Sequence, residues 1–318
     1  MSPIKIGVAG IGSMGVNHCK ALRRMENIEF IGLYDANREK GEEVANQFSV
    51  SAFSSYEELL HAIDAVIIAV PTLYHFSLTI QAIQKGKHVL VEKPFVTSLK
   101  EAEQLITLVE KESVIVQVGH VERFNPAFNQ LSKIINSNDL ISFEARRFGV
   151  PNRKMDTDVI LDIMIHDIDL ILQLVNSPLS NTYGVGYYMG EDNRLEAASA
   201  LLSFQNGCFA SLYSSRFPIE KKRSLYVTEK NRFLKTNLLT KELYIYNKVN
   251  DSSTCIRPYH SENIVEKIMI PPLDALNLEI EHFLHSIQSQ QSPKVDVYQA
   301  AKVLEVALKI KQQIDNKN

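Results

Sequence analysis

The chain has 318 residues, of which 45% are hydrophobic and 22% charged, and its formal net charge is −3. This length predicts two domains, each large enough to bury its own core. The mildly acidic balance excludes nucleic acid as the main partner, because a surface that binds it is strongly basic. The longest apolar runs, such as 65–70, have the length of a strand and exclude a membrane span.

The three cysteines, Cys19, Cys208 and Cys255, are isolated in the sequence and lack CxxC spacing. We therefore expect reduced thiols, with no disulfide and no cysteine metal site. Since the first expected strand begins at Ile4, we also expect no signal peptide and a cytoplasmic location.

The first third of the chain alternates strands and helices. Strands are expected at 4–9, 28–34, 51–53, 65–69, 88–91 and 114–118, and helices at 14–25, 39–48, 56–62, 74–85 and 98–111. Ser98 and Glu101 have the spacing of a capping box at the start of the last helix. This alternation predicts an α/β fold, a doubly wound parallel sheet with helices on both faces. In such sheets, ligands bind at the carboxyl ends of the strands.

The first strand is followed by a glycine-rich turn, 10–15, with the sequence GIGSMG. Gly10 permits a tight turn, Gly12 lets the backbone approach a pyrophosphate, and Gly15 lets the next helix pack closely. The start of that helix offers unpaired N–H groups and a partial positive charge to phosphates. A glycine pattern alone can be a simple tight turn, but strand, turn and helix together predict a dinucleotide site.

The second strand ends in Asp35, roughly 20 residues beyond the glycines, where a carboxylate that binds a ribose belongs. This carboxylate predicts NAD rather than NADP as the cofactor, because it repels a 2′-phosphate. Arg38 could instead receive that phosphate; we expect it to be a surface charge at the start of a helix.

The pattern changes after His120. A helix is expected at 125–136, a strand at 141–148 and a long helix at 159–175. Seven strand-like segments follow at 182–189, 197–204, 208–214, 224–228, 233–237, 243–246 and 264–269, and then helices at 274–288 and 297–312. Asn206-Gly207 predicts a hairpin turn. Successive strands predict an α+β domain with a large, mostly antiparallel open sheet. We expect a cofactor domain at 1–120 and a second domain at 121–318.

Glu92, Lys93 and Pro94 come at the end of the strand expected at 88–91. A lysine here is ordinarily a solvated surface charge, yet this strand ends where the nicotinamide of a dinucleotide is expected. Pro94 keeps Lys93 out of helical geometry. An ammonium group at this point could polarise a substrate oxygen or relay a proton, and spacing alone leaves both interpretations open.

The segment 161–169, LDIMIHDID, places acidic and histidine side chains on one face of an expected helix. Asp162 and His166 are at i and i+4, and Asp169 continues that face. The neighbouring positions are apolar, so the helix is expected to be buried and its charges to need partners. His166 is either a core histidine paired with a carboxylate or a general base oriented by Asp162. A metal site with His120 is a third option, but the spacing matches no familiar ligand set.

Taken together, these motifs resemble the Gfo/Idh/MocA oxidoreductase family over nearly the whole chain. The matching segments are 10–15 (GIGSMG), 70–75 (VPTLYH), 86–94 (GKHVLVEKP) and 162–166 (DIMIH). The resemblance implies a Rossmann domain, a second domain with an open sheet that often packs against another subunit, and hydride chemistry on a sugar alcohol. It implies catalytic roles for Lys93 and His166, supported by Asp162, and a nicotinamide pocket bordered by Pro71, Thr72 and His75.

A narrower similarity concerns 118–126 (VGHVERFNP) and 162–169, which resemble the UDP-N-acetylglucosamine 3-dehydrogenase group. It implies oxidation of the C3 hydroxyl of a UDP-N-acetylhexosamine. Arginine suits a diphosphate because its fork donates two hydrogen bonds. The second domain begins with four arginines, Arg123, Arg146, Arg147 and Arg153, although each could be a surface charge that balances an acid. The alternatives are a dehydrogenase of free polyols or sugars such as inositol, and an NAD-binding regulator without turnover.

These considerations define the expected sites. For NAD they are Gly10, Gly12, Ser13, Met14, Gly15, Asp35, Arg38, Pro71, Thr72, His75, Glu92 and Lys93. For the substrate they are Lys93, Arg123, Asn125, Arg147, Asp162 and His166. The alcohol is expected between Lys93, which stabilises the developing alkoxide, and His166, which removes the hydroxyl proton. Few helices remain to cover the second sheet, so we expect a homodimer or homotetramer. We expect no partner among nucleic acids or membranes.

Overall fold

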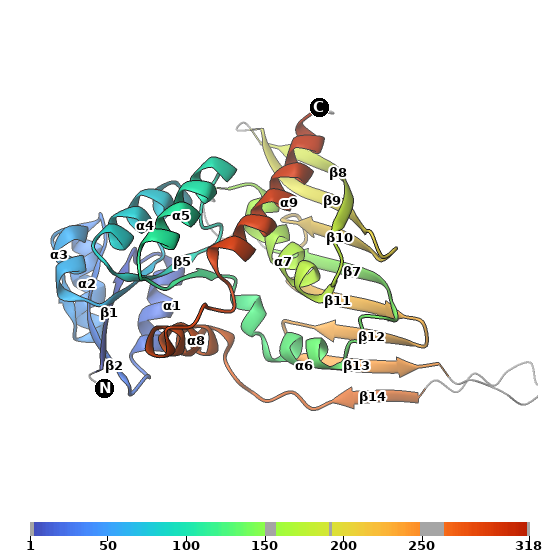
Figure 1. Cartoon of the computed structure of the whole chain (residues 1–318), viewed down its shortest axis with the longest axis horizontal. Coiled ribbons are helices and arrows are strands. Elements are labelled where there is room, and N and C mark those ends of the chain that lie inside the picture. Colours follow the sequence, from blue (N-terminus) through green and yellow to red (C-terminus); the bar gives the residue numbers. More distant parts are fainter. Residues whose placement is uncertain (1–2, 150–156, 191–192, 249–263, 317–318) are drawn as a thin grey trace, which may run out of the picture. The chain divides into compact units, whose positions relative to one another are not determined.

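The computed structural model describes residues 3–149, 157–190, 193–248 and 264–316 (Figure 1). The chain forms two compact units. Unit 1 comprises residues 1–121 and 274–305, and unit 2 comprises residues 122–273 and 306–318. The segment 274–305 thus belongs to the same compact unit as the N-terminal residues. As a functional division, the cofactor domain 1–120 and the second domain 121–318 stay a prediction.

Unit 1 contains a six-stranded sheet in the order β3-β2-β1-β4-β5-β6, and every pair in it is parallel. Its strands are β1 (Ile4–Ala9), β2 (Ile28–Tyr34), β3 (Ser51–Ala52), β4 (Ala65–Ile68), β5 (His88–Glu92) and β6 (Val116–Gly119). The strand order reverses direction between β1 and β4, and this is where a doubly wound sheet binds dinucleotides. The predicted doubly wound parallel sheet is confirmed.

The helices of unit 1 begin where the sequence signals them. They are α1 (Ser13–Leu22), α2 (Arg38–Phe48), α3 (Tyr56–Ala62), α4 (His75–Gln84), α5 (Leu99–Lys111), α8 (Ala275–Ser289) and the N-terminal part of α9 (Val297–Asp315), with a 3₁₀ turn, η1 (Thr72–Tyr74), before α4. Asn37, Ser55 and Asp274 accept hydrogen bonds from the first turns of α2, α3 and α8. Ser98 and Glu101 form the predicted capping box of α5. Such local caps fix where the helices start because they satisfy otherwise unpaired N–H groups.

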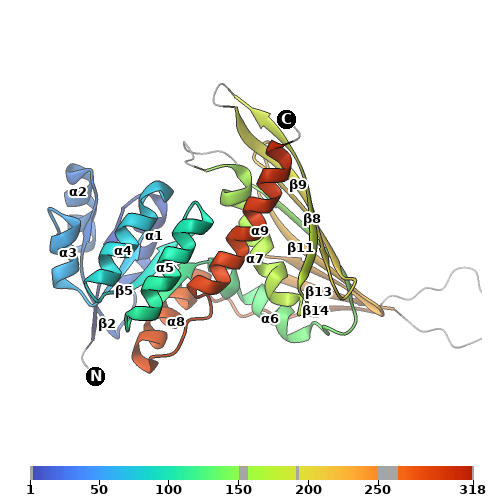
Figure 2. The same cartoon turned by 45° about the horizontal axis from the view of Figure 1, so that its top comes forward.

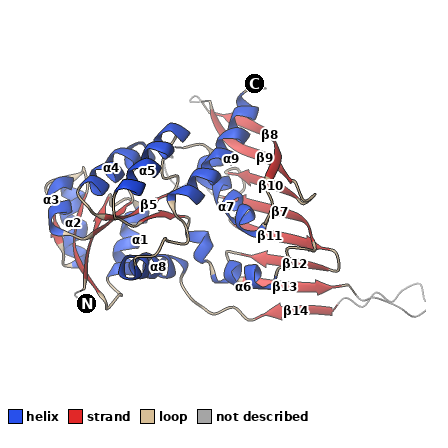
Figure 3. Ribbon diagram, in the orientation of Figure 1, coloured by secondary structure: helices blue, strands red, loops and turns tan. Residues whose placement is uncertain are grey.

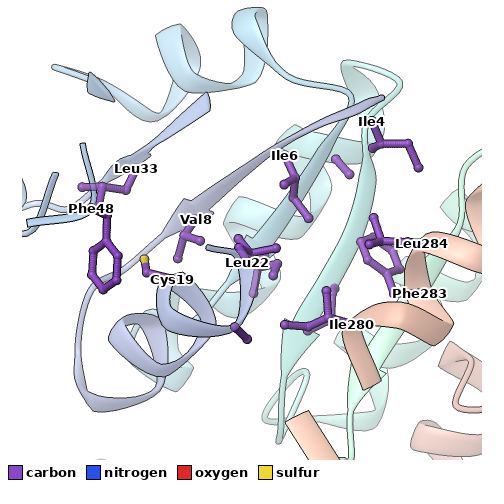
Figure 4. Close-up of a cluster of buried hydrophobic side chains, with 14 of the residues drawn as sticks. Ile4, Ile6, Val8, Cys19, Leu22, Leu33, Phe48, Ile280, Phe283 and Leu284 are labelled. Atoms are coloured by element: carbon purple, nitrogen blue, oxygen red, sulfur yellow. The ribbon is translucent and has the colours of Figure 1, made fainter. Parts of the chain in front are cut away.

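One face of the parallel sheet packs into an apolar cluster that includes α8 (Figure 4). Ile6 and Val8 of β1 and Leu22 of α1 lie in this cluster with Ile280 and Phe283 of α8, and all five are fully or almost fully buried. A helix that comes late in the sequence therefore completes the core of unit 1. The sequence predicted a helix at 274–288, but only the packing shows which sheet this helix covers.

Unit 2 contains an eight-stranded sheet in the order β14-β13-β12-β11-β7-β10-β9-β8 (Figure 3). The strands are β7 (Leu140–Phe148), β8 (Leu179–Met189), β9 (Arg194–Phe204), β10 (Phe209–Ser215), β11 (Lys222–Glu229), β12 (Arg232–Asn237), β13 (Glu242–Asn247) and β14 (Ile264–Ile268). Among the described strands of this sheet, only β7 and β10 pair in parallel. Gly207, at φ +85°, makes the predicted hairpin turn between β9 and β10. The expectation of a large, mostly antiparallel sheet is confirmed.

The helical elements of unit 2 lie on one side of this sheet (Figure 2). They are η2 (Val121–Phe124, which begins at the boundary), α6 (Pro126–Ile134), a π-helical turn η3 (Ile160–Met164), α7 (Ile165–Leu174) and the C-terminal part of α9 (Val297–Asp315). At Gly184 and Gly186 of β8, an added Cβ would come within about 3 Å of α9 atoms, so α9 approaches this strand closely. Among the described residues, no helix covers the other face of the sheet (Figure 2).

The opposite face of the unit 2 sheet carries a row of exposed apolar side chains, which we call the outer row. Strand alternation places these residues on one face because cross-strand partners share it. They are Tyr183, Val185, Tyr187, Met189, Leu201, Phe209, Tyr213, Phe233 and Val265. Tyr187 is the most exposed of them at 63%.

Candidate active site

The glycine turn of unit 1 has the geometry that phosphate binding requires. Gly10 has φ +86°, and a Cβ there would lie 2.7 Å from Ala69, so only glycine fits. A Cβ on Gly15 would lie 1.9 Å from the Gly10 carbonyl oxygen, whereas one on Gly12 would meet no atom within 4 Å. The first turn of α1 has neither a side-chain cap nor an acidic residue. Its N–H groups and the open space at Gly12 therefore fit a pyrophosphate.

The predicted ribose ligand, Asp35, lies beside this turn at the end of β2. Its two carboxylate oxygens accept 2.8 Å hydrogen bonds from the backbone N–H groups of Ile11 and Asn37. These bonds fix the carboxylate against the glycine turn, and an ionised carboxylate keeps further acceptor positions. Arg38, the first residue of α2, is largely exposed and pairs with Glu42 one turn later. The structure thus places Arg38 as the surface charge at a helix start that the sequence predicts.

The segment after β4 is fastened to the segment after β5 by His75. One ring nitrogen of His75 lies 2.8 Å from the Pro94 carbonyl oxygen, and the other lies 2.9 Å from that of Val70. Thr72 is buried in the 3₁₀ turn between them, whereas Pro71 is exposed. Since β4 and β5 are neighbours, His75 holds together two strand exits that were predicted to border the nicotinamide.

Lys93 is half-buried directly after β5, and the residue before it belongs to a buried ion pair. Glu92 lies 2.8 Å from Nε2 of His18, a residue of α1 with no exposed surface. Burial alone would raise the pKa of Glu92, but the hydrogen bond to His18 and the nearby cationic groups, Lys93 among them, lower it below its ordinary value. The EKP segment is therefore anchored from behind by a histidine that sequence spacing did not reveal.

In unit 2, Asp162 and His166 lie on either side of the junction between the π-helical turn and α7. Asp158 caps this start by accepting hydrogen bonds from the backbone N–H groups of Ile160 and Leu161, at 2.9 and 3.0 Å. Lys311 of α9 holds Asp158 at 2.8 Å. Both Asp162 and His166 are half-buried. A single π turn inside a helix is rare and recurs at functional sites. The sequence predicted an uninterrupted helix here.

Two of the predicted phosphate-binding arginines are instead buried in ion pairs within unit 2. Arg123 is 3% exposed, and its guanidinium contacts Asp169 at 2.6–3.0 Å. Arg147 is 4% exposed and donates to Asp167 and Glu122 at 2.8 Å. These contacts arise because a buried charge needs a partner of opposite sign.

The remaining residues of this prediction lie elsewhere. Asn125 is buried and donates to Glu122 and to the Leu238 carbonyl, at 2.9 Å in each case. Arg146 lies on the opposite face of the sheet from Arg147, about half exposed, and pairs with Glu144. Arg153 lies outside the described residues, as does Cys255. The structure therefore does not gather the described arginines into one exposed cationic cluster.

The two carboxylates on Arg147 have opposite pKa shifts. For Glu122, burial raises the pKa, but Arg147 together with a second cation, Arg223, lowers it below its ordinary value. For Asp167, burial outweighs the attraction of Arg147, the charge of Glu122 adds to burial, and the pKa is raised. The network therefore holds Glu122 more firmly ionised than Asp167.

Comparison with known proteins agrees with this architecture. Residues 4–120 match the model of the oxidoreductase family with an NAD-binding Rossmann fold, GFO_IDH_MocA, and residues 142–229 match the C-terminal domain of the same family. The chain belongs to the Gfo/Idh/MocA family. It is thus an oxidoreductase, a dehydrogenase that acts on a CH–OH group, and its N-terminal domain binds NAD(H).

Within this family, the chain is similar over its full length to a UDP-N-acetylglucosamine 3-dehydrogenase of Acidithiobacillus ferrooxidans. The two share 30% identity over 98% of this chain and 97% of that protein, and the solved structure of that enzyme superposes with a TM-score of 0.88 over 99% of both chains. A scyllo-inositol 2-dehydrogenase (NAD⁺) of Bacillus subtilis is 26% identical over 96% of this chain and 92% of its own length. A levoglucosan dehydrogenase solved with NADH and levoglucosan has a TM-score of 0.87 at 19% identity, over 99% of this chain and 98% of its own, and shares the fold.

Three buried residues of this Gfo/Idh/MocA protein were not found by sequence reasoning. They are His18 behind the EKP segment, Glu279 on α8, and Arg216, which contacts Asp162. His18 and Glu279 lie within ordinary helices and Arg216 lies just after a strand, and the partners of His18 and Arg216 are distant in sequence. Burial predicted from periodicity marks such polar residues as unusual, but it cannot name the partner.

Among the described residues, the two cysteines, Cys19 and Cys208, are free thiols and are buried. In the same part of the chain, no group of three or more potential histidine, cysteine or carboxylate ligands could hold a metal ion. The described helices include none with both the length and the apolar character of a bilayer span.

Proposed function

We propose that this protein is an NAD-dependent dehydrogenase that oxidises the C3 hydroxyl of a UDP-N-acetylhexosamine such as UDP-N-acetylglucosamine. The observation that carries the proposal is the full-length similarity to a UDP-N-acetylglucosamine 3-dehydrogenase, at 30% identity over 98% of the chain. A cytoplasmic location is part of the proposal.

The proposal gives each residue one chemical role. NAD, when bound, accepts the hydride from the carbon that carries the hydroxyl. His166 removes the hydroxyl proton as general base, and Asp162 supports it. Lys93 stabilises the negative charge that develops on the substrate oxygen. The Gly10–Gly15 turn holds the pyrophosphate with backbone N–H groups, and Asp35 accepts hydrogen bonds from the ribose hydroxyls.

The buried ion pairs change how UDP recognition is proposed. A guanidinium already bound to a carboxylate in the interior would have to lose that partner to bind a diphosphate, and breaking a buried pair is costly. Arg123 and Arg147 are therefore proposed to shape unit 2 from within. The UDP part of the proposal rests on the relative and not on an arginine cluster.

The decisive experiment follows NADH formation by its absorbance with purified protein and candidate alcohols. We expect UDP-N-acetylglucosamine to be oxidised, free N-acetylglucosamine to be a poor substrate, and UDP alone to inhibit competitively against the nucleotide sugar. Mass spectrometry of the product, after reduction with borodeuteride, locates the oxidised carbon. Oxidation of free inositol or glucose without inhibition by UDP would overturn the assignment.

A second candidate is a dehydrogenase of free polyols or sugars. It is favoured by the similarity to a scyllo-inositol 2-dehydrogenase at 26% identity over 96% of the chain. The same assay decides between the two, because UDP should then have no effect. If none of the candidate sugars reduces bound NAD, the result would favour an NAD-binding regulator without turnover.

We further propose NAD as the preferred cofactor and self-association through the outer row. Asp35 repels a 2′-phosphate, so kcat/KM should be higher with NAD than with NADP; equal values would contradict this. An uncovered apolar face of this kind is typical of an interface. Sedimentation should show a dimer or tetramer, and Tyr187→Asp should shift it towards monomer. A wild-type protein that is monomeric at micromolar concentration would contradict the interface.

A further inference from the structure

Arg216 lies immediately after β10 and is 4% exposed. One terminal nitrogen, Nη2, donates to Oδ2 of Asp162 at 3.1 Å and to the backbone carbonyl of Thr157 at 3.0 Å. The other, Nη1, donates to both carboxylate oxygens of Glu196 on β9, at 3.2 and 3.3 Å. One buried side chain thus joins a strand of the sheet to the segment that carries Asp162.

These contacts fix the start of the helix formed by η3 and α7 at two points. Thr157 directly precedes Asp158, which caps the π-helical turn, and Asp162 lies within that turn. A helix start held only by its cap could rotate about its axis. A planar guanidinium that donates to a carbonyl and a carboxylate in that segment restricts this rotation, because its donors lie in one rigid fork.

Glu196, the second carboxylate bonded to Arg216, explains why the arginine side chain itself stays in place. The Arg216 backbone N–H donates to the Glu196 carbonyl at 3.0 Å, in addition to the side-chain pair between the same residues. Glu196 therefore fixes Arg216 to the sheet through main chain and side chain. Asp162 is then held by a group that is itself rigid, whereas a flexible surface arginine could not define its orientation.

We propose that Arg216 is a positioning residue that orients Asp162 for its role in the reaction. This rests on the proposed function, in which Asp162 supports His166 as general base. Arg216 contacts Asp162 and Glu196 and acts through the former. A small displacement of a supporting group costs up to about 100-fold in rate, so the effect should appear in kcat.

A double-mutant cycle tests this. Turnover is measured for Arg216→Met, Asp162→Asn and the combined variant, with UDP-N-acetylglucosamine or, if that is the alcohol oxidised, scyllo-inositol. Alone, R216M should lower kcat about 10- to 100-fold and leave the Kd for NAD unchanged. In the D162N background, R216M should change kcat less than about twofold, because the group that it positions is already altered. A merely structural role would give multiplicative losses.

Two further variants complete the test. Arg216→Lys keeps one charged donor and should recover part of the lost kcat. Arg146→Met, which removes an exposed arginine paired with Glu144 on the same sheet, should leave kcat unchanged. If R216M is not recovered as a folded protein by circular dichroism, the cycle is run with R216K and judged by the same criterion.

The outcomes separate the inference from the proposed function. If D162N retains the kcat of the wild type, the supporting role of Asp162 is wrong, and the inference is overturned with it. A second outcome is that D162N loses turnover and that adding R216M or R216K to D162N lowers kcat by the same factor as it does in the wild type. Asp162 then keeps its role, and only the inference is overturned. Near-equal kcat in D162N and the double variant supports both.

Discussion

The two units stabilise buried charge in different ways. In unit 1, the EKP segment is anchored by a histidine, His18, and an acid without any side-chain hydrogen-bond partner among the described residues, Glu279, lies nearby. In unit 2, arginines such as Arg123 and Arg147 neutralise the buried carboxylates. Within the described part of the chain, Glu279 has no hydrogen-bond partner on its carboxyl oxygens and a raised pKa, whereas Asp169 and Asp167 are each bonded to an arginine, which stays charged at any accessible pH. The stability of unit 1 should therefore respond to pH through Glu279, and that of unit 2 most strongly to the loss of an arginine.

The largest effect is expected where each unit contributes a reacting group. Lys93→Met and His166→Ala should each lower kcat by about 100- to 10,000-fold, the usual cost of losing a positioned acid–base group. Isothermal titration should show NAD binding nearly as tight as in the wild type. His61→Ala, at an exposed histidine, is the matched control for turnover. A His166→Ala variant with near-native kcat would make this histidine structural and leave catalysis to unit 1.

The next effect concerns the buried arginines of unit 2. Arg147→Met leaves Asp167 buried without its cation and Glu122 with Arg223 alone, and it should reduce the free energy of unfolding by about 3–5 kcal/mol. Arg146→Met, one residue earlier on the opposite face, removes an exposed pair and should cost less than about 1 kcal/mol. Urea denaturation measures both. If Arg147 bound the diphosphate, Arg147→Met would instead raise KM for the nucleotide sugar and leave the free energy of unfolding unchanged.

A pH effect on stability is expected from Glu279, a buried acid of unit 1. Burial holds the pKa of Glu279 well above its ordinary value, and the charge of Glu92 raises it further. The unfolded chain loses this proton near pH 4.3, about the ordinary value, while the folded protein keeps it. Unfolding therefore releases a proton, and the free energy of unfolding falls by up to about 1.4 kcal/mol per pH unit as pH rises towards the folded pKa.

Glu279→Gln keeps the shape of the neutral acid and removes this dependence. The variant should be more stable than the wild type above the ordinary carboxyl range, with a difference that grows with pH. Thermal unfolding from pH 5 to 9 measures the difference. Glu92, whose pKa is lowered, contributes stability that is lost in acid, so it does not account for a slope in the alkaline direction. Parallel curves for the two proteins would show that Glu279 is ionised in the fold.

The smallest effect in stability is expected at Gly12, and it can be set against Gly15 in the same turn. A Cβ on Gly12 meets no atom within 4 Å, so Gly12→Ala should change the free energy of unfolding by less than about 1 kcal/mol. The same change at Gly15 places a Cβ 1.9 Å from the Gly10 carbonyl and should destabilise unit 1 strongly. Gly12→Ala should still weaken NAD binding, because its methyl group fills the space proposed for the pyrophosphate. Unchanged NAD affinity in this variant would place the cofactor elsewhere.

The amino-acid sequence by itself determined the features that depend on neighbouring residues. The turn at Gly10, the capping box of Ser98 and Glu101 and the hairpin at Gly207 were all predicted, and the structure has each of them. These features arise from backbone geometry and hydrogen bonds within a few residues. The alternation of strand and helix likewise predicted the parallel sheet, since short connections leave few topologies.

Only the tertiary structure decided which buried charges meet. Arg123 and Asp169 are 46 residues apart, and Arg216 and Asp162 are 54 apart. An arginine near a proposed site has the same local signature whether it faces a phosphate or a carboxylate. The packing of α8 onto the parallel sheet, which buries Glu279, likewise cannot be predicted from the neighbouring residues in the sequence. Desolvation and pairing of charges depend on every element that packs around them, and the chain brings those elements together only when it folds.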